Sequence, residues 1–250
     1  MENPTIPNTA RMLDYWLGGN HHFPVDVEAS KVFTDIYPYF PEVFQTLRNY
    51  IGRASRYIAS QGIDQFIVFG SGLPTCGNVH EAVPQAKVLY TDIDQTNIEL
   101  GQKILADNPH VNYSFCDATN LDTLDQSIVT QTLGSFKRLG LVFVGVSAFI
   151  PDEVLATVLD QLYDWCPVGS FLALDFDGEA GVNYPQLLEL MDSFNAHLYM
   201  RNPTNIKPLL GRWKLINPGI VPVADWEPDL PAPSSINPED VFMYGCVVYK

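Results

Sequence analysis

The pattern of apolar positions divides the chain into a helical start and a longer region where strand and helix patterns alternate. Apolar residues recur at three- and four-residue steps over 10–17, 25–36 and 42–60, which predicts three helices. The double glycine at 18–19 follows the first, as glycine commonly follows a helix C-terminus. We therefore expect residues 1–60 to form an N-terminal helical lid or extension.

The first strand is expected at 66–69, where four apolar residues stand side by side without alternation. Such a run is typical of a strand buried on both faces of a parallel sheet. Further apolar runs, separated by helix patterns, are centred on 87–91, 111–116, 139–146 and 170–176. Repeated βα units predict an α/β fold with a doubly wound, mostly parallel sheet.

The pattern changes near the C-terminus. After a predicted helix at 184–199, apolar runs at 213–216 and 241–249 have no helix between them, so the last strand is expected to be antiparallel. The proline-rich stretch 222–238 is typical of a packed surface loop. We expect residues 61–250 to form one compact domain around a seven-stranded sheet.

Composition restricts the possible partners. The 250 residues are 46% hydrophobic, which is enough for one full core. A net charge of -15, from 14 basic and 29 acidic residues, opposes binding to nucleic acid or anionic membranes. No apolar run approaches the ~18 residues of a membrane span, and we expect a cytoplasmic protein.

The four cysteines are too far apart for metal-binding pairs, and no metal is expected. They are predicted to be reduced thiols. Cys76 lies near a predicted helix start, a position that can lower a thiol pKa.

A glycine turn follows the first strand at Gly70, Ser71 and Gly72. Its two glycines allow a sharp turn and close approach of a ligand to the backbone, and a helix pattern over 77–83 would direct free N–H groups at the same space. The turn is thus either a nucleotide-cofactor cradle or an ordinary tight connection.

Acidic residues at the next strand ends favour the cradle. Asp92 follows the second strand, about 20 residues after the glycines, where a carboxylate can accept hydrogen bonds from ribose hydroxyls. Asp117 and Ala118 follow the third strand and are placed to bind an exocyclic amine such as that of adenine.

Two cofactors fit a strand, glycine turn and acid in this order. A nicotinamide dinucleotide requires a third glycine for the helix that faces its pyrophosphate, and Thr75 stands there instead. S-adenosylmethionine has no pyrophosphate. The sequence favours the methyl donor, with an NAD(P)-dependent oxidoreductase as the alternative.

Four segments carry a resemblance to a known family: GSGLPTCGNVHE at 70–81, ARMLDYWLGGNHHF at 10–23, VSAFIPDE at 146–153 and NPGIVPVADWEPD at 217–229. Together they resemble a bacterial family of S-adenosylmethionine-dependent methyltransferases. The resemblance implies a Rossmann-like class I methyltransferase fold, with the glycine turn at the donor, Asp92 at its ribose and Asp117 near its adenine. Around these positions we expect further donor contacts from Leu73, Thr75, Asn78, His80, Ile93, Ala118 and Val146. The product would be S-adenosylhomocysteine.

Acceptor chemistry is expected on the lid, because its helices can fold over the strand ends. We interpret His22 or His21 as the base, with Tyr15 as a second choice, although the histidines are equally compatible with a purely structural loop. Arg11 is expected to bind the donor carboxylate or to pair with Asp14 or Glu2. Family members typically carry a lysine and an acid where this chain has Asn20 and His21.

The acceptor is expected to be a small or medium-sized organic molecule, methylated at oxygen or nitrogen. Aromatic residues predicted to line its pocket are Tyr15, Trp16, Phe23, Phe149, Tyr184 and Trp226. A non-catalytic module that binds S-adenosylmethionine is a further alternative.

Overall fold

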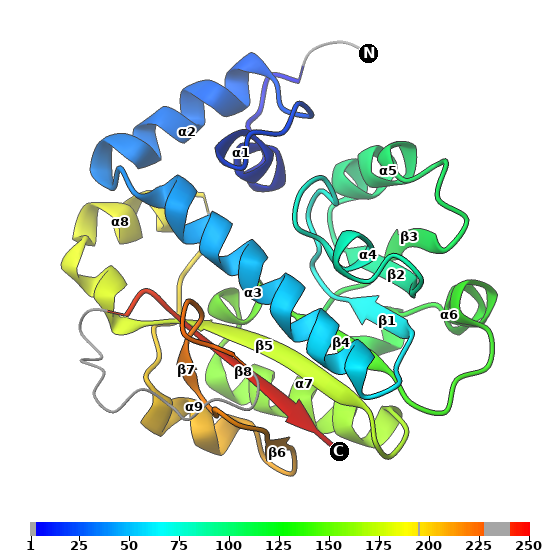
Figure 1. The fold of residues 1–250 in the computed structure, drawn as a ribbon. Helices are drawn as coiled ribbons and strands as arrows, with labels where there is room; N and C mark the ends of the chain where they lie inside the picture. Colours follow the sequence, from blue (N-terminus) through cyan, green and yellow to red (C-terminus); the bar gives the residue numbers. More distant parts are fainter. Residues whose placement is uncertain (1–3, 195, 228–240) are drawn as a thin grey trace.

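A central sheet organises the part of the chain that the computed structural model describes, residues 4–194, 196–227 and 241–250 (Figure 1). The strand order is β3-β2-β1-β4-β5-β8-β6, with β7 also paired to β8. Neighbours among the first five strands are parallel, and β8 runs antiparallel to its partners. The strands are β1 (Gln65–Val68), β2 (Lys87–Asp92), β3 (Val111–Phe115), β4 (Gly140–Phe143), β5 (Phe171–Asp177), β6 (Lys214–Leu215), β7 (Val221–Pro222) and β8 (Met243–Tyr249).

The predicted mostly parallel sheet with an antiparallel last strand is confirmed. The described sheet has eight strands rather than seven, because the two-residue strand β7 adds a pairing to β8. β4 is shorter than expected and ends at Phe143, shortly before Gly145, whose φ of +79° departs from a strand conformation.

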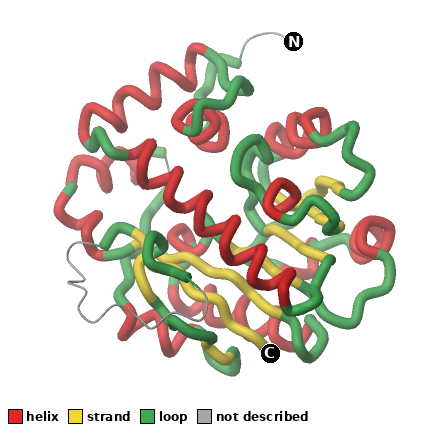
Figure 2. The backbone as a smooth tube through the Cα atoms, viewed as in Figure 1, coloured by secondary structure: helices red, strands yellow, loops and turns green. Residues whose placement is uncertain are grey.

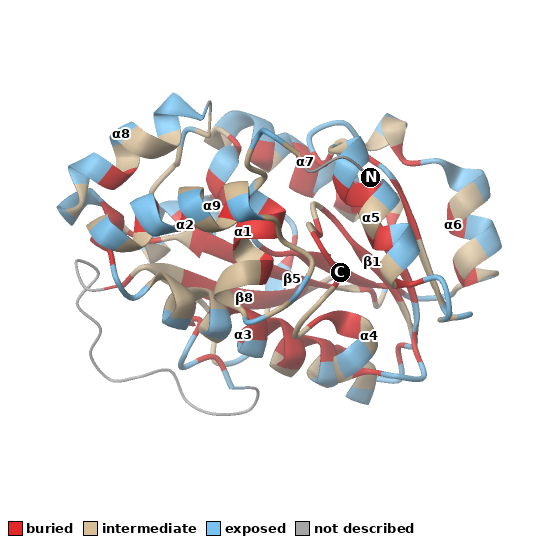
Figure 3. Ribbon diagram, turned by 90° about the horizontal axis from the view of Figure 1, so that it is seen from above, coloured by how far each residue is buried: buried red, intermediate tan, exposed pale blue. Residues whose placement is uncertain are grey.

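Both faces of the sheet are covered, as the uninterrupted apolar run of β1 requires. Phe66 and Val68 belong to one buried cluster, while Ile67 and Phe69 belong to the other. Figure 3 shows the buried strands between two helix layers. The first layer contains α3 (Phe40–Ser60), α4 (Val79–Ala82) and α5 (Gln95–Ile104), and the second contains α6 (Gln126–Leu133), α7 (Asp152–Trp165) and α9 (Pro203–Leu209).

The helix α3 belongs to the sheet, although its residues fall within the predicted extension 1–60. The Tyr50 hydroxyl lies 2.8 Å from the Leu174 carbonyl oxygen and 2.7 Å from that of Cys246, so it shares its proton between β5 and β8. This contact fastens the antiparallel strand to the parallel part of the sheet.

Three helices form a separate group beyond the strand ends. They are α1 (Thr9–Trp16), α2 (Pro24–Ile36) and α8 (Pro185–Ser193). Met12, Phe33 and Leu187 form their shared buried cluster. Figure 2 shows loops gathered between α1 and the strand ends, so the N-terminal helices lie where a lid is expected.

Local hydrogen bonds explain where helix predictions differ from the structure. The predicted helix at 121–132 is divided into a short 3-10 helix, η1 (Leu121–Thr123), and the helix α6. The Asp125 side chain caps the start of α6 by accepting hydrogen bonds from the backbone N–H groups of Ser127 and Ile128. The helix expected at 184–199 ends at Ser193. The helix α9 was not predicted; it contains Pro203 and Pro208, which disguise it, and Asn202 caps it. Most of the loop predicted at 222–238 lies outside the described residues.

A buried ion pair joins α1 to α2. The Arg11 Nε lies 2.7 Å from Asp26 Oδ2, and the two side chains are 4% and 0% exposed. The same carboxylate accepts hydrogen bonds from the backbone N–H groups of Asn8, at 3.0 Å, and Phe23, at 2.9 Å. Arg11 also donates to the Ile6 carbonyl at 2.8 Å. Asp26 thus binds the residue before α1, the helix α1 itself and the residue before α2 at one buried position.

Substituting Asp26→Ala should loosen this region selectively. The change leaves the Arg11 charge buried without its partner, which costs about 3–5 kcal/mol. Hydrogen exchange should show lost protection in α1 and α2 while β1 to β5 remain protected. Asp160→Ala is the control, because Asp160 pairs with Arg212 at the surface and such pairs contribute under ~1 kcal/mol. Equal, small effects of both changes would contradict the assigned role of Asp26.

Candidate functional site

The site begins where the ends of β1 and β4 meet, the point at which the strand order reverses. Gly70 has a φ of +55°, and a Cβ there would lie 2.4 Å from Val146 Cγ2. Gly72 has a φ of +60°, and its Cβ would lie 3.2 Å from the Ala10 Cβ of α1. The turn therefore has β4 on one side and the lid on the other, and glycine is required at Gly70 by both conformation and space.

Asp92 lies against this turn. It is 7% exposed, and its Oδ2 accepts a hydrogen bond from the Gly72 N–H at 2.9 Å. Its Oδ1 accepts from the Asp94 N–H at 2.9 Å. Oδ1 also accepts from the Asn97 side-chain amide at 3.4 Å, so Oδ2 is the oxygen that keeps a lone pair for a further donor such as a ribose hydroxyl. The neighbouring Ile93 is 62% exposed.

The end of β3 carries Asp117 and the buried Ala118. The Asp117 Oδ1 accepts from the backbone N–H of Thr119 at 2.8 Å and from its hydroxyl at 2.7 Å. These bonds fix the carboxylate at the edge of the sheet next to β2.

Several residues predicted to contact the donor make hydrogen bonds inside the protein that hold the glycine turn and the segment after it in place. The Ser71 hydroxyl donates to the Tyr113 hydroxyl at 2.8 Å, and Tyr113 donates to the Gly72 carbonyl at 2.6 Å. The ring Nδ1 of His80 lies 2.8 Å from the Tyr90 hydroxyl, and burial lowers the pKa of His80. Leu73 is buried and Thr75 is half-buried.

Asn78, another predicted donor contact, is the partner of an arginine that sequence reasoning missed. The Arg48 Nη1 donates to Asn78 Oδ1 at 2.8 Å, and burial lowers the pKa of Arg48. The available signal was an arginine next to Leu47 on the apolar face of α3.

The segment after the turn differs from the expected helix over 77–83. The helix α4 has only four residues, Val79–Ala82. The predicted fall in the pKa of Cys76 is wrong: burial raises it, and the charges of Glu81 and Asp14 raise it further. A four-residue helix supplies too small a dipole to oppose these effects.

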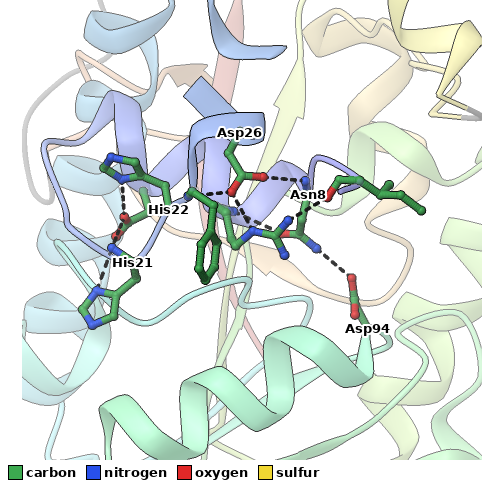
Figure 4. A network of polar contacts seen from close by, with 9 residues as sticks. Asn8, His21, His22, Asp26 and Asp94 are labelled. Atoms are coloured by element: carbon green, nitrogen blue, oxygen red, sulfur yellow. Dashed lines mark hydrogen bonds and ion pairs between the residues drawn. The ribbon is translucent and has the colours of Figure 1, made fainter. Parts of the chain in front are cut away.

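The lid side of the site is a network around two buried carboxylates (Figure 4). Asp14 is 1% exposed, and its Oδ2 accepts from the His21 backbone N–H at 2.7 Å and lies 3.0 Å from His22 Nδ1. The Tyr15 ring meets the His22 ring edge to face at 5.1 Å. The structure therefore brings together the three predicted base candidates, with Asp14 at their centre.

Arg11 has a partner that was not predicted. It pairs with Asp26 rather than with Asp14, and Glu2 lies outside the described residues. Its contact with the donor carboxylate stays a prediction.

Asn8 ties this network to the sheet. Its side-chain amide donates to Asp94 Oδ2 at 2.8 Å, across the gap between the lid and the loop after β2. In Figure 4, the histidines lie at one end of the network and Asp94 at the other. Sequence reasoning assigned no site role to Asn8, Asp26 or Asp94 and considered Asp14 only as a partner of Arg11, because polar residues near helix ends are commonly caps, as Asn8 and Asp94 also are.

The predicted aromatic pocket is not assembled as expected. Trp226 is fully buried and packs edge to face on Tyr50, at 5.5 Å, within the core. Trp16 stacks on Phe40 and Phe44. Phe149 remains 45% exposed beside the end of β4.

Two further acids lie at the end of β5. Burial raises the pKa of Asp175 to about 8, and the charge of Asp177 adds to the shift. Asp175 Oδ1 accepts from the Gly145 N–H at 2.8 Å, so this side chain holds the loop after β4. The pKa of Asp177 is raised to about 7, also by burial.

The pH dependence of stability follows from Asp175. Its folded pKa lies above the ~3.9 of an unfolded aspartate, so between pH ~4 and ~8 the folded state keeps a proton that the unfolded state loses. The free energy of unfolding should therefore fall as pH rises from 5 to 8. Asp175→Asn keeps an acceptor for Gly145 but cannot ionise, and denaturant titrations should show a decline smaller by up to roughly 4 kcal/mol. An unchanged slope, matching that of the exposed control Asp122→Asn, would contradict this account.

The arrangement fits S-adenosylmethionine better than a dinucleotide. The Asp92 carboxylate lies beside the glycine turn, where a ribose is expected, whereas the short α4 offers no helix end for a pyrophosphate. Among the described residues there is neither a cluster of three potential metal ligands nor a helix long and apolar enough to cross a membrane.

Comparisons with known proteins agree with this assignment of the cofactor. A crystal structure of a DUF574 family protein from Streptomyces avermitilis is 27% identical, with a TM-score of 0.83 over 98% of this chain and 97% of that one. A methyltransferase candidate from Thermobifida fusca is also 27% identical, with a TM-score of 0.84 over 98% and 95%. The magnesium protoporphyrin IX methyltransferase of Synechocystis, crystallised with S-adenosylhomocysteine, is 12% identical over 96% and 93%; its TM-score of 0.55 shows a shared fold.

No curated protein matches the sequence. The S-adenosyl methyltransferase family matches residues 3–250, almost the entire chain. Together with the glycine turn and Asp92, this match shows that the chain belongs to the S-adenosyl methyltransferase family and is an enzyme that uses S-adenosylmethionine as its methyl donor.

Proposed function

We propose that this methyltransferase acts on an oxygen or nitrogen atom of a small or medium-sized organic molecule, by in-line displacement. The observation that carries the proposal is the group of Tyr15, His21 and His22 on a lid that contacts the glycine turn. Hydroxyl and amine acceptors release a proton on methylation, and a nearby base speeds that release.

The donor is held by the strand ends. The backbone at Gly70 to Gly72 and the carboxylates of Asp92 and Asp117 would bind it, while Val146 limits the space beside Gly70. When bound, S-adenosylmethionine supplies a methyl group on a positively charged sulfur, which keeps the electron pair of the broken carbon–sulfur bond.

The chain supplies position and a proton acceptor. Alignment of two reactants supplies most of the acceleration in such a displacement. The Asn8–Asp94 and Ala10–Gly72 contacts hold the lid against the donor loop, so the histidines keep a fixed place relative to it.

The charge of the chain supports a small acceptor. A net charge of -15 repels nucleic acid, and the long-range field offers no attraction to a phosphate backbone. We accordingly propose a cytoplasmic enzyme whose partner is a metabolite-sized molecule.

Donor binding is expected to depend on Asp92 and not on His22. In calorimetric titrations, S-adenosylhomocysteine should bind the wild type, and Asp92→Ala should weaken binding at least about tenfold, or ~1.4 kcal/mol. His22→Ala and the exposed control Asp107→Ala should change the affinity less than about twofold. Equal losses from Asp92→Ala and His22→Ala would place His22 in the donor site, and tight binding of NADH alone would favour an oxidoreductase.

Transfer itself can be followed without knowing the acceptor. Incubation with methyl-labelled S-adenosylmethionine and cell extract should move the label into a small extractable molecule. His22→Ala should reduce this transfer by about 100-fold, the usual contribution of a general base. Label found only in nucleic acid or protein would contradict the small acceptor, and binding without any transfer would indicate a non-catalytic module.

A further inference from the structure

Asp14 is a buried carboxylate around which the loop 18–22 is folded. It is 1% exposed, and it accepts a hydrogen bond from the His21 N–H at 2.7 Å. A Cβ on Gly19 would lie 2.0 Å from Asp14 Oδ1, so only glycine fits there. The double glycine that ends α1 therefore also makes room for this side chain.

The carboxylate is incompletely satisfied. Oδ1 has no hydrogen-bond partner, and His21 Nδ1, which lies 3.8 Å from it, is also unpartnered. Burying a charged group without full hydrogen bonding is costly, and native proteins retain such groups mainly where they have a task.

The contact with His22 determines the position of the imidazole proton. The His22 Nδ1 lies 3.0 Å from Asp14 Oδ2, and an ionised carboxylate can only accept. Nδ1 must then carry the hydrogen, which leaves the lone pair of Nε2 available as a base. The His22 side chain is 23% exposed, and Tyr15 packs against its ring at 5.1 Å.

This pair lies close to the donor loop. The helix α1 contacts Gly72 through Ala10, one turn before Asp14. Asp14 is near enough to Cys76, on the far side of that loop, for its charge to raise the thiol pKa. The Asp14 carboxylate and the His22 imidazole thus lie on the helix and loop that cover the glycine turn.

We propose that Asp14 is a positioning residue that holds His22 in the Nδ1–H form, so that Nε2 removes the acceptor's proton during methyl transfer. This inference rests on the proposed function. As the acceptor oxygen or nitrogen bonds to the methyl carbon, the carbon–sulfur bond would break with its electron pair left on the sulfur of S-adenosylhomocysteine. The acceptor's proton passes to Nε2, and the imidazolium that results lies beside the negative charge of Asp14. That charge therefore stabilises the form of His22 that the reaction produces.

Among the described residues, His22 is the only histidine whose ring lies within hydrogen-bond distance of a buried carboxylate. The His197 Nδ1 lies 2.8 Å from Asp192 Oδ1, but both side chains are more than half exposed, at 63% and 55%. The partner of His80 is a tyrosine hydroxyl, which can donate or accept and does not fix a tautomer. His197 and Asp192 therefore provide a matched control on the surface of the same molecule.

The tautomer can be measured directly. Nitrogen-15 NMR of the ring nitrogens, on the full chain saturated with S-adenosylhomocysteine, should show His22 protonated on Nδ1. Asp14→Ala should give a mixture of tautomers, whereas Asp14→Asn, which keeps an oxygen for both N–H groups, should preserve Nδ1–H. Asp192→Ala should leave the His22 signals unchanged.

The extract assay supplies the second readout. Asp14→Ala should lower transfer about 100-fold and Asp14→Asn about tenfold, with unchanged affinity for S-adenosylhomocysteine. The double variant with His22→Ala should lose little more than either single change, because the two residues act as one unit. Asp192→Ala should transfer at the wild-type rate.

The possible outcomes separate this inference from the proposed function. A wild-type His22 protonated on Nε2, or transfer by Asp14→Ala within threefold of wild type, would overturn the role of Asp14. Absence of any wild-type transfer would overturn the proposed function, while the NMR result would still decide the tautomer. If Asp14→Ala does not fold, the wild-type tautomer and Asp14→Asn decide.

Discussion

The close approach of three segments at the glycine turn is the constraint on which the site depends. Val146 of the β4 end occupies the space where Gly70 would place a side chain, and Ala10 of the lid lies against Gly72. The turn can hold these positions because glycine adopts positive φ without a steric penalty. Any larger residue at Gly70 would push the β4 loop away from β1 and open the switch point at which the donor is proposed to bind.

Buried polar groups hold the lid in register over this turn. An ion pair between Arg11 and Asp26, fully removed from water, has a large desolvation cost and is stable only with additional hydrogen bonds. Asn8 and Phe23 provide them through their backbone N–H groups. The Asn8 side-chain amide also donates a hydrogen bond to Asp94, which lies outside the lid in the loop after β2. Since such groups tolerate little displacement, they specify one arrangement of α1 relative to the sheet where apolar packing alone would allow several.

Charge is distributed unevenly around the two halves of the site. The half proposed to bind the donor has carboxylates at the strand ends, where one oxygen of each remains able to accept further hydrogen bonds. The lid half encloses Asp14 and leaves the His22 ring partly exposed. A buried carboxylate next to a partly exposed imidazole is suited to accept a proton from a neighbour, so the proposed donor binding and proton removal would fall to different segments of one chain.

The sequence predicted the elements whose patterns are long and periodic. The strands β1 to β5 and the helices α1 to α3 follow from runs of apolar residues, because burial on one or two faces imposes a period that is visible in the letters. The cofactor also followed from local signals, since Gly70, Gly72 and Asp92 stand at consecutive strand ends. The strand β7 was missed because two residues show no period, and α9 was missed because Pro203 and Pro208 disguise a seven-residue helix.

The sequence by itself determined the fold class, the donor and the place of the lid, because these depend on backbone conformation and burial, which each residue type expresses locally. Only the tertiary structure decided the partners of the polar side chains. Arg11 pairs with Asp26 fifteen residues away, and Asp14 meets the loop that carries His22, through contacts that depend on how the chain folds back on itself. Pairing of charges is a property of distance in space, and no spacing along the chain encodes it.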